Sequence, residues 1–292
     1  MRNKFVLFLL ALVLAGSLPA CAQAVYSAQS LHPRTPRVPE SVQFAGKTYR
    51  FDRPDQYERM DRELIAFTFA HTNSLLMLRR ADRMFSLVVP ILKKNGIPED
   101  MKYLMAIECN LDPTSVSVAG AKGPWQFMKA AARENGLEVN DEVDERYHIQ
   151  KATEAACKYL KAAYAKYGDW ITVAASYNAG QGGISQRIDV QRQKSAMDLS
   201  LPAETSRYIF RLLTAKYFFE HPEEFGFHVS PEECYPYVAP RETVTVSGPI
   251  ESLTDFAEKH GTTYFLLKEA NLWLRGDKLT NKSGKTYRIA IP

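Results

Sequence analysis

The chain has 292 residues, of which 46% are apolar and 24% charged, and this is the composition of an ordinary globular protein. Its length suggests one or two domains and is sufficient to bury a hydrophobic core without stabilising disulfides or metals. Basic residues number 37 and acidic residues 33, and this near balance gives no support to nucleic-acid binding, which usually shows a dense basic patch.

The first twenty residues have the organisation of a secretory signal. Arg2 and Lys4 form a basic start, a run of apolar and small residues covers 5–16, and small residues precede Cys21. This succession predicts a signal peptide over 1–20. A membrane-spanning helix is the alternative, but such a helix needs about 20 apolar residues and this run is too short.

Leu18-Pro19-Ala20-Cys21 resembles a lipobox, in which the cysteine becomes the lipidated first residue. We therefore expect Cys21 to carry a lipid that is the only attachment to a membrane. Ala22 lacks the Asp that marks inner-membrane retention in some bacteria, so we expect an outer-membrane lipoprotein facing the periplasm of a Gram-negative cell. Ordinary cleavage after Ala22-Gln23-Ala24, which would release a soluble periplasmic protein, is the alternative.

Residues 21–54 are expected to form a tether, because Pro33, Pro36 and Pro39 stand among polar residues. Within it, 42–50 fits a short hairpin around Ala45-Gly46. From 55 to about 225 the apolar residues recur with helical spacing and strand patterns are nearly absent, which predicts a mainly α domain. One helix is expected to run through Leu64 and Arg79, and a second to end at Asn95-Gly96. Further helices are expected at 99–109, 125–134, 150–167, 169–178 and 203–219.

A proline-containing linker over 229–241 separates this domain from a small module of about 50 residues, 242–292. The module begins with an alternating strand at 242–246 and closes with another at 287–291. Short helices are expected between the strands, at 253–261 and 266–271, so the predicted order is βααβ.

Glu108 stands on the apolar face of the helix expected at 99–109. Met101, Leu104 and Met105 fall at i, i+3 and i+4, and Glu108 occupies i+7 of the same stripe. Burial disfavours the charged form of a carboxyl and raises its pKa, so that Glu108 could give a proton to a glycosidic oxygen near neutral pH. The alternative is that the helix ends early and lifts Glu108 clear of the core, since Asn110 follows closely.

Three segments follow this helix in order: Ser-Val-Ala-Gly-Ala-Lys-Gly-Pro-Trp-Gln-Phe-Met at 117–128, Ala-Ser-Tyr-Asn-Ala-Gly at 175–180 and Glu-Thr-Ser-Arg-Tyr at 204–208. Together with Glu108 they resemble the lytic transglycosylase family, which has a lysozyme-like fold, and in particular its membrane-bound D subgroup. The resemblance covers about residues 55–228. It implies a lysozyme-like catalytic domain that binds and cuts peptidoglycan strands.

The resemblance assigns roles to single residues. Glu108 stands where the family has its catalytic acid and base. Cys109 replaces a usual Ser and is expected to be a packing change, because its side chain points about 100° away around the helix. As an alternative, the glycines of these three segments could be plain turn and cap residues, and their polar and aromatic residues could be capping or core residues. Substrate-binding roles are implied for Ser117, Gln126 and Met128 along the sugar cleft, for Tyr177 and Asn178 beside the cut bond, and for Glu204 and Tyr208.

The carboxylate count bears on the mechanism. Most hydrolytic glycosidases use two carboxyls, and no second carboxyl is obviously paired with Glu108, since Asp112 lies past the expected helix end. The family resemblance implies that the muramic acid C6 hydroxyl attacks its own anomeric carbon and leaves a 1,6-anhydro end. No metal or cofactor is expected. The other cysteines fit neither a disulfide framework nor a zinc site.

The module at 242–292 loosely resembles a LysM peptidoglycan-binding domain, and a purely structural cap is the alternative. Three rival functions remain open at this point: a peptidoglycan-binding lipoprotein without turnover, a muramidase that uses water, and a cysteine peptidase acting through Cys109. The last is disfavoured because Cys109 sits at a helix carboxy end without a basic neighbour in sequence.

Overall fold

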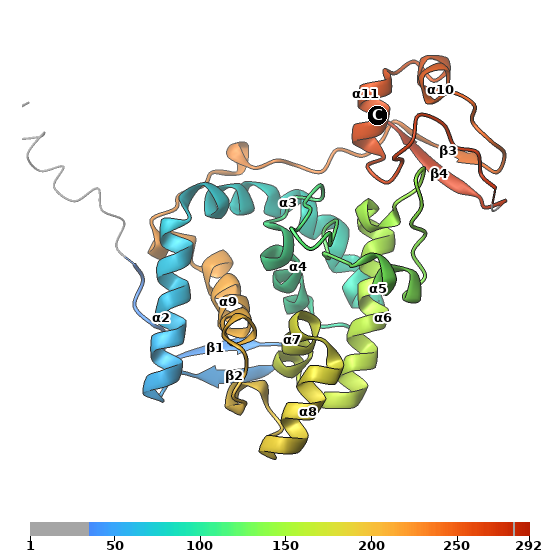
Figure 1. The fold of residues 1–292 in the computed structure, drawn as a ribbon. Coiled ribbons are helices and arrows are strands. Elements are labelled where there is room, and N and C mark those ends of the chain that lie inside the picture. The colour runs from blue at the N-terminus through green and yellow to red at the C-terminus, as the bar shows by residue number, and fades with distance from the viewer. Residues whose placement is uncertain (1–34, 283) are drawn as a thin grey trace, which may run out of the picture. The chain divides into compact units, whose positions relative to one another are not determined.

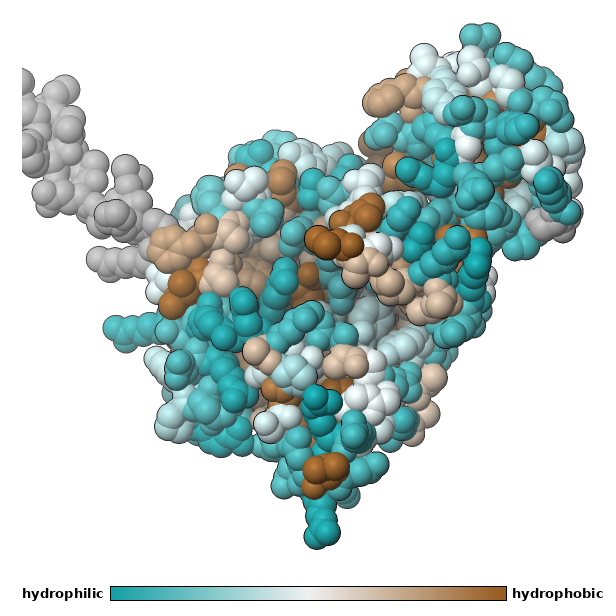
Figure 2. Space-filling view, in the orientation of Figure 1, coloured by the Kyte–Doolittle hydropathy of each residue, from teal (hydrophilic) through white to brown (hydrophobic). Residues whose placement is uncertain are grey.

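A computed structural model describes residues 35–282 and 284–292 (Figure 1). The predicted signal peptide, the lipobox and Cys21 lie outside the described residues. The mainly α fold class with a small βααβ module is confirmed. On the face drawn in Figure 2, hydrophilic residues predominate and exposed apolar side chains form small groups. Within the described residues, no helix is both long and apolar enough to cross a bilayer.

The expected hairpin is present as strands β1 (Ser41–Phe44) and β2 (Lys47–Arg50), which pair antiparallel. Ala45 and Gly46 both have positive φ angles of 51° and 82°, as a tight hairpin turn requires. Phe44 is fully buried against the helical domain, so this part of the expected tether is anchored to the fold.

Helices α2 (Pro54–Phe69) and α3 (His71–Lys94) differ from the prediction in where they divide. The break falls at Ala70, and α3 continues without interruption past Arg79, so the expected first helix is wrong at its carboxy end. The Ser74 hydroxyl donates to the carbonyl of Phe67 at 2.6 Å. This bond satisfies a carbonyl that loses its helical partner at the break, a local arrangement that apolar periodicity does not reveal.

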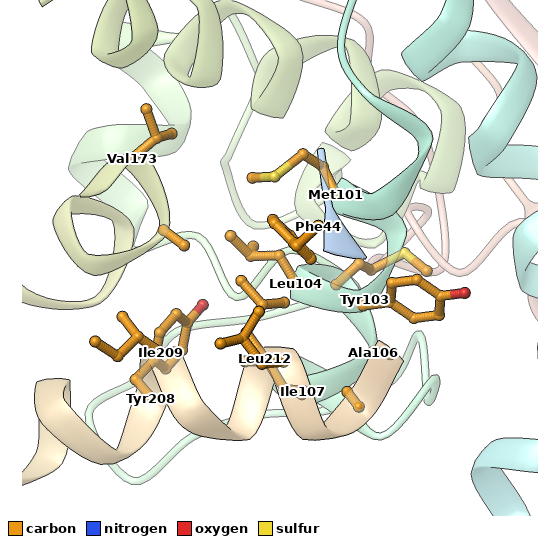
Figure 3. Close-up of a cluster of buried hydrophobic side chains, with 14 of the residues drawn as sticks. Phe44, Met101, Tyr103, Leu104, Ala106, Ile107, Val173, Tyr208, Ile209 and Leu212 are labelled. Atoms are coloured by element: carbon orange, nitrogen blue, oxygen red, sulfur yellow. The ribbon is translucent and has the colours of Figure 1, made fainter. Parts of the chain in front are cut away.

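Helix α4 lies near the centre of this domain in the view of Figure 1. Helix α4 (Lys102–Cys109) follows a 3₁₀ turn, η1 (Glu99–Met101), and ends at Asn110 in a left-handed conformation. It packs against α3 and α9, and Figure 3 shows its Leu104 and Ile107 beside Leu212 of α9. The other helices are α5 (Lys129–Glu134), α6 (Ile149–Tyr167), α7 (Trp170–Ala179), α8 (Gln181–Gln191) and α9 (Ala203–Glu220).

Two of these helices depart from the prediction. The helix expected at 125–134 begins only at Lys129, because Gln126 has a positive φ of 46° and lies in a turn. Helix α8 was not predicted at all. It buries only Ile184 and carries Gly182 and Gly183 in its first turn, so it lacks both an apolar stripe and helix propensity.

The carboxy-terminal module has the predicted order. Strand β3 (Glu242–Val246) pairs antiparallel with β4 (Tyr287–Ile291), and α10 (Leu253–Lys259) and α11 (Tyr264–Ala270) lie between them in sequence. Leu253, Leu267 and Ile289 are fully buried in a hydrophobic core separate from that of the larger domain.

Candidate active site

Glu108 lies in the last turn of α4, with its side chain half-buried rather than lifted clear of the core. Tyr208, which projects from α9 toward α4 (Figure 3), donates its hydroxyl to Glu108 Oε1 at 2.5 Å. Because Oε1 accepts this bond, the proton of the neutral carboxyl belongs on Oε2. Among the described residues no side chain or backbone group bonds to Oε2, so this oxygen is available to a substrate.

The pKa of Glu108 is raised from 4.5 to about 7. Burial is the largest cause and raises the pKa, and the negative charge of Glu204 raises it further. The hydrogen bond from Tyr208 and the positive charge of Arg211 act in the opposite direction. This confirms the expectation from the apolar stripe, and a carboxyl with this pKa can both donate and accept a proton near neutral pH.

Tyr177 connects α7 with the loop over 115–128, which we call the active-site loop. Its hydroxyl donates to the carbonyl of Trp125 at 2.6 Å, and its ring packs edge-on against Tyr159. Burial, and then the charge of Glu108, raise the pKa of Tyr177 well above 10, so its hydroxyl keeps its proton. Tyr177 therefore lies near Glu108 and fixes part of this loop to the helical domain.

The other predicted site residues fall into two groups. Asn178 on α7 donates to Glu204 Oε1 on α9 at 3.3 Å, so these two meet at the surface. By contrast, Ser117 and Gln126 form their hydrogen bonds within the active-site loop: the Ser117 hydroxyl accepts from Ala121 N, and the Gln126 amide nitrogen donates to two loop carbonyls. Met128 is half exposed at the end of the loop. None of these last three side chains is hydrogen-bonded to Glu108.

Two further carboxylates lie close in sequence or space. Burial raises the pKa of Asp112, but hydrogen bonds from Thr114 and the charge of Arg80 outweigh burial and keep the pKa below its usual value. Asp112 is therefore engaged in its own turn. Glu204 is the exposed carboxylate whose charge acts on Glu108.

Cys109, next to Glu108, is not suited to nucleophilic attack. Its side chain is buried and its Sγ lies 3.3 Å from the carbonyl oxygen of Met105. Burial raises the pKa of its thiol to about 12, whereas a reactive cysteine needs a lowered pKa. This agrees with the expectation of a packing residue.

Sequence reasoning missed Arg211, whose charge reaches Glu108. Arg211 also lines a small pocket with Asn110 and with the buried Glu63. A signal was present, because Glu204, Tyr208 and Arg211 recur at i, i+4 and i+7 and so share one face of α9.

Two regions of the chain match known protein families. Residues 90–199 match the transglycosylase SLT domain family, and residues 242–292 match the soluble lytic transglycosylase C-terminal LysM-like domain family. Membrane-bound lytic murein transglycosylase D of Escherichia coli strain K12 is 26% identical over 152 residues, which are 50% of this chain and 34% of that protein. The corresponding protein of Escherichia coli O6:H1 shows the same values.

A phage protein gives a shorter match. Peptidoglycan transglycosylase gp16 of Escherichia phage T7 is 37% identical over 91 residues, which are 30% of this chain and 7% of the phage protein. The matched region spans about a third of the length of the two Escherichia coli proteins. The chain therefore contains a transglycosylase SLT domain followed by a LysM-like domain of the soluble lytic transglycosylase type, and it is homologous to membrane-bound lytic murein transglycosylase D.

Proposed function

We propose that this protein is a peptidoglycan lytic transglycosylase that cuts the β-1,4 bond between N-acetylmuramic acid and N-acetylglucosamine, with Glu108 as general acid and base. The observation that carries the proposal is the state of Glu108 within the SLT domain: its pKa is about 7, and Tyr208 occupies one carboxyl oxygen while the other is available. The names of the relatives support the substrate class.

The reaction needs one carboxyl. Protonated Glu108 gives its proton to the glycosidic oxygen, and the bond from that oxygen to the muramic acid anomeric carbon breaks. The substrate's acetamido group stabilises the cationic centre. The carboxylate of Glu108 then accepts the proton of the C6 hydroxyl as its oxygen bonds to the anomeric carbon, which leaves a 1,6-anhydro end and consumes no water. Intramolecular attack gains from proximity.

Substrate binding is assigned to the surfaces that flank Glu108. The pair formed by Asn178 and Glu204 links α7 to α9, and Tyr208 lies on the same face of α9 as Glu204. Tyr177 stands beside the cut bond in this proposal. Ser117, Gln126 and Met128 shape the cleft through the active-site loop, since two of them fasten its turns.

One observation favours a second candidate, a muramidase that uses water. The charge of Glu204 acts on Glu108, so a second carboxylate does lie in the neighbourhood, contrary to the expectation from sequence spacing. Hydrolytic glycosidases use such a pair, the second carboxylate activating water or forming a covalent intermediate.

Mass spectrometry of digested peptidoglycan separates the candidates. Insoluble peptidoglycan is incubated with the purified protein, and the released muropeptides are identified. Our proposal predicts 1,6-anhydro ends, which are lighter than reducing ends by one water. Reducing ends would indicate the muramidase, cut stem peptides the peptidase, and no product a binding protein.

The cell envelope is the expected location. One curated relative is membrane-bound by name, and we propose that Cys21 supplies a lipid anchor to the outer membrane, with a soluble periplasmic protein as the alternative.

A further inference from the structure

We propose that the LysM-like module is an intramolecular clamp that holds the active-site loop, rather than an independent glycan-binding unit on a free tether. The partner surface is the segment over 138–147 of the same chain, which we call the docking segment. The effect on catalysis rests on the function proposed above, whereas the effect on loop order does not.

Backbone hydrogen bonds join the docking segment to the module. The amide of Asp144 donates to the carbonyl of Trp273 at 2.9 Å, and Val143 and Leu274 form an antiparallel bridge. The amide of Arg275 donates to the carbonyl of Glu142 at 2.7 Å. Backbone groups paired in this way fix both the distance and the register of the two surfaces.

Two carboxylates of the docking segment bind module residues. Glu142 Oε2 accepts from the amide and the hydroxyl of Thr280, at 2.7 and 2.9 Å. Glu138 Oε2 accepts from Lys285 Nζ at 2.9 Å and from the Tyr287 hydroxyl at 3.0 Å. Hydrogen bonds to an ionised acceptor are stronger than those between neutral groups. These four bonds therefore contribute to the attachment.

The docking segment also contributes to the hydrophobic core of the module. Val143 and Tyr147 are buried in the module's apolar cluster and not in that of the larger domain. The guanidinium of Arg275 lies 4.7 Å from the centre of the Tyr147 ring, and Trp273 stacks on His148. Undocking would expose these apolar side chains to water, which disfavours a freely tethered module.

The docking segment in turn holds the active-site loop. Asp144 and Arg146 form a buried ion pair, and Arg146 Nη1 donates to the carbonyls of Gly120 at 3.3 Å and Phe127 at 3.2 Å. The backbone of the loop also lies directly against this segment at Gly123, where a Cβ atom would lie 1.9 Å from the carbonyl oxygen of Arg146. The same loop supplies the carbonyl of Trp125 that binds Tyr177.

A continuous path of contacts therefore runs from the module through Asp144 and Arg146 to the loop beside Glu108. Asp144 is the junction, because its backbone binds the module and its side chain holds Arg146. Loss of docking would release the backbone of Asp144 and admit water to the ion pair. The active-site loop would then lose the partner of two of its carbonyls, and its geometry would loosen.

The first experiment tests docking in the 292-residue chain. A protease site is inserted after Ala239, in an exposed stretch between the two parts, and the folded protein is cut there. A clamp stays bound after cleavage, and both fragments elute together in size-exclusion chromatography. Separate elution of the two fragments would overturn the proposal.

The second experiment tests the effect on the loop in the uncut protein. The double substitution Glu138→Ala and Glu142→Ala removes the four bonds to the module. Hydrogen–deuterium exchange over 115–128 should then rise at least about tenfold, and the kcat on short soluble glycan strands should fall by a similar factor, because small losses of positioning cost rate. Val143→Asp, which places a charge in the module's core, is a second route to undocking.

A matched control removes two exposed carboxylates that lie outside the docking segment, by Glu134→Ala and Glu269→Ala. Neither side chain forms a hydrogen bond or ion pair in the described part of the chain, so exchange and rate should stay as in the wild type. If the module undocks but exchange over 115–128 is unchanged, the clamp is wrong. A further outcome is a wild-type protein that cuts no glycan while the double substitution still raises exchange over 115–128. That result would support the clamp and refute the proposed function.

Discussion

The raised pKa of Glu108 makes a prediction about stability that does not depend on substrate. In the folded chain the pKa is about 7, and in the unfolded chain it returns to about 4.5. Below pH 4.5 the carboxyl is protonated in both states, and folding is not penalised. As the pH rises toward 7 the unfolded chain ionises first, so the free energy of unfolding falls, and the loss is complete above the folded-state pKa.

The size of this loss follows from the shift. One pKa unit corresponds to about 1.4 kcal/mol, so the shift corresponds to roughly 3 kcal/mol. Glu108→Gln keeps the size of the side chain and an oxygen that can accept from Tyr208, but it does not titrate. The variant should therefore match the wild type at low pH and become more stable than it by up to about 3 kcal/mol above neutrality.

Urea unfolding of both proteins, at about pH 4 and about pH 8.5, measures the difference. Glu134→Gln is the control and should show no such gain, because the Glu134 carboxyl is exposed and forms no hydrogen bond or ion pair within the described residues. The same Glu108→Gln protein should lose at least about 100-fold in rate, because general acid–base assistance is worth about 10²–10⁴-fold. A stability difference that does not grow with pH would refute the idea that burial sets the pKa of Glu108.

Three further predictions concern the charges around Glu108, the lipid anchor at Cys21 and the role of Cys109. Arg211→Gln should raise the pKa of Glu108 and move the alkaline limb of the kcat–pH profile to higher pH. Glu204→Gln should lower this pKa and move the limb to lower pH. Shifts of the two variants in the same direction would contradict the charge assignments. Cys21→Ala should release a soluble, active enzyme from membranes, and a wild-type protein found wholly soluble would refute the anchor. Cys109→Ser should keep most activity, and complete loss in a folded variant would revive the peptidase.

The sequence predicted those features that depend on neighbours along the chain. The stripe that carries Glu108, the hairpin at Ala45-Gly46 and the βααβ order of the module follow from local periodicity and turn chemistry, and all are present. Glu108 could be assigned a raised pKa before its surroundings were known, because its position on an apolar helix face already implies burial.

The features that sequence reasoning missed depend on contacts between distant segments. The break at Ala70 is stabilised by a bond from Ser74, and the loop around Gln126 is held from outside by Arg146. Nothing in the local pattern of Glu142 and Val143 distinguishes a docking surface from an ordinary loop, since their partners lie more than a hundred residues away. Tertiary contacts of this kind override local propensity.

The source of the oxygen at the new sugar end tests the central claim most directly. The protein is incubated with peptidoglycan in water enriched in a heavy oxygen isotope, and the products are examined by mass spectrometry. If Glu108 directs attack by the muramic acid C6 hydroxyl, the 1,6-anhydro products contain no heavy oxygen, and Glu108→Gln forms almost none of them. Reducing ends that carry the heavy isotope would mean that water attacks the anomeric carbon, and the transglycosylase mechanism would be contradicted.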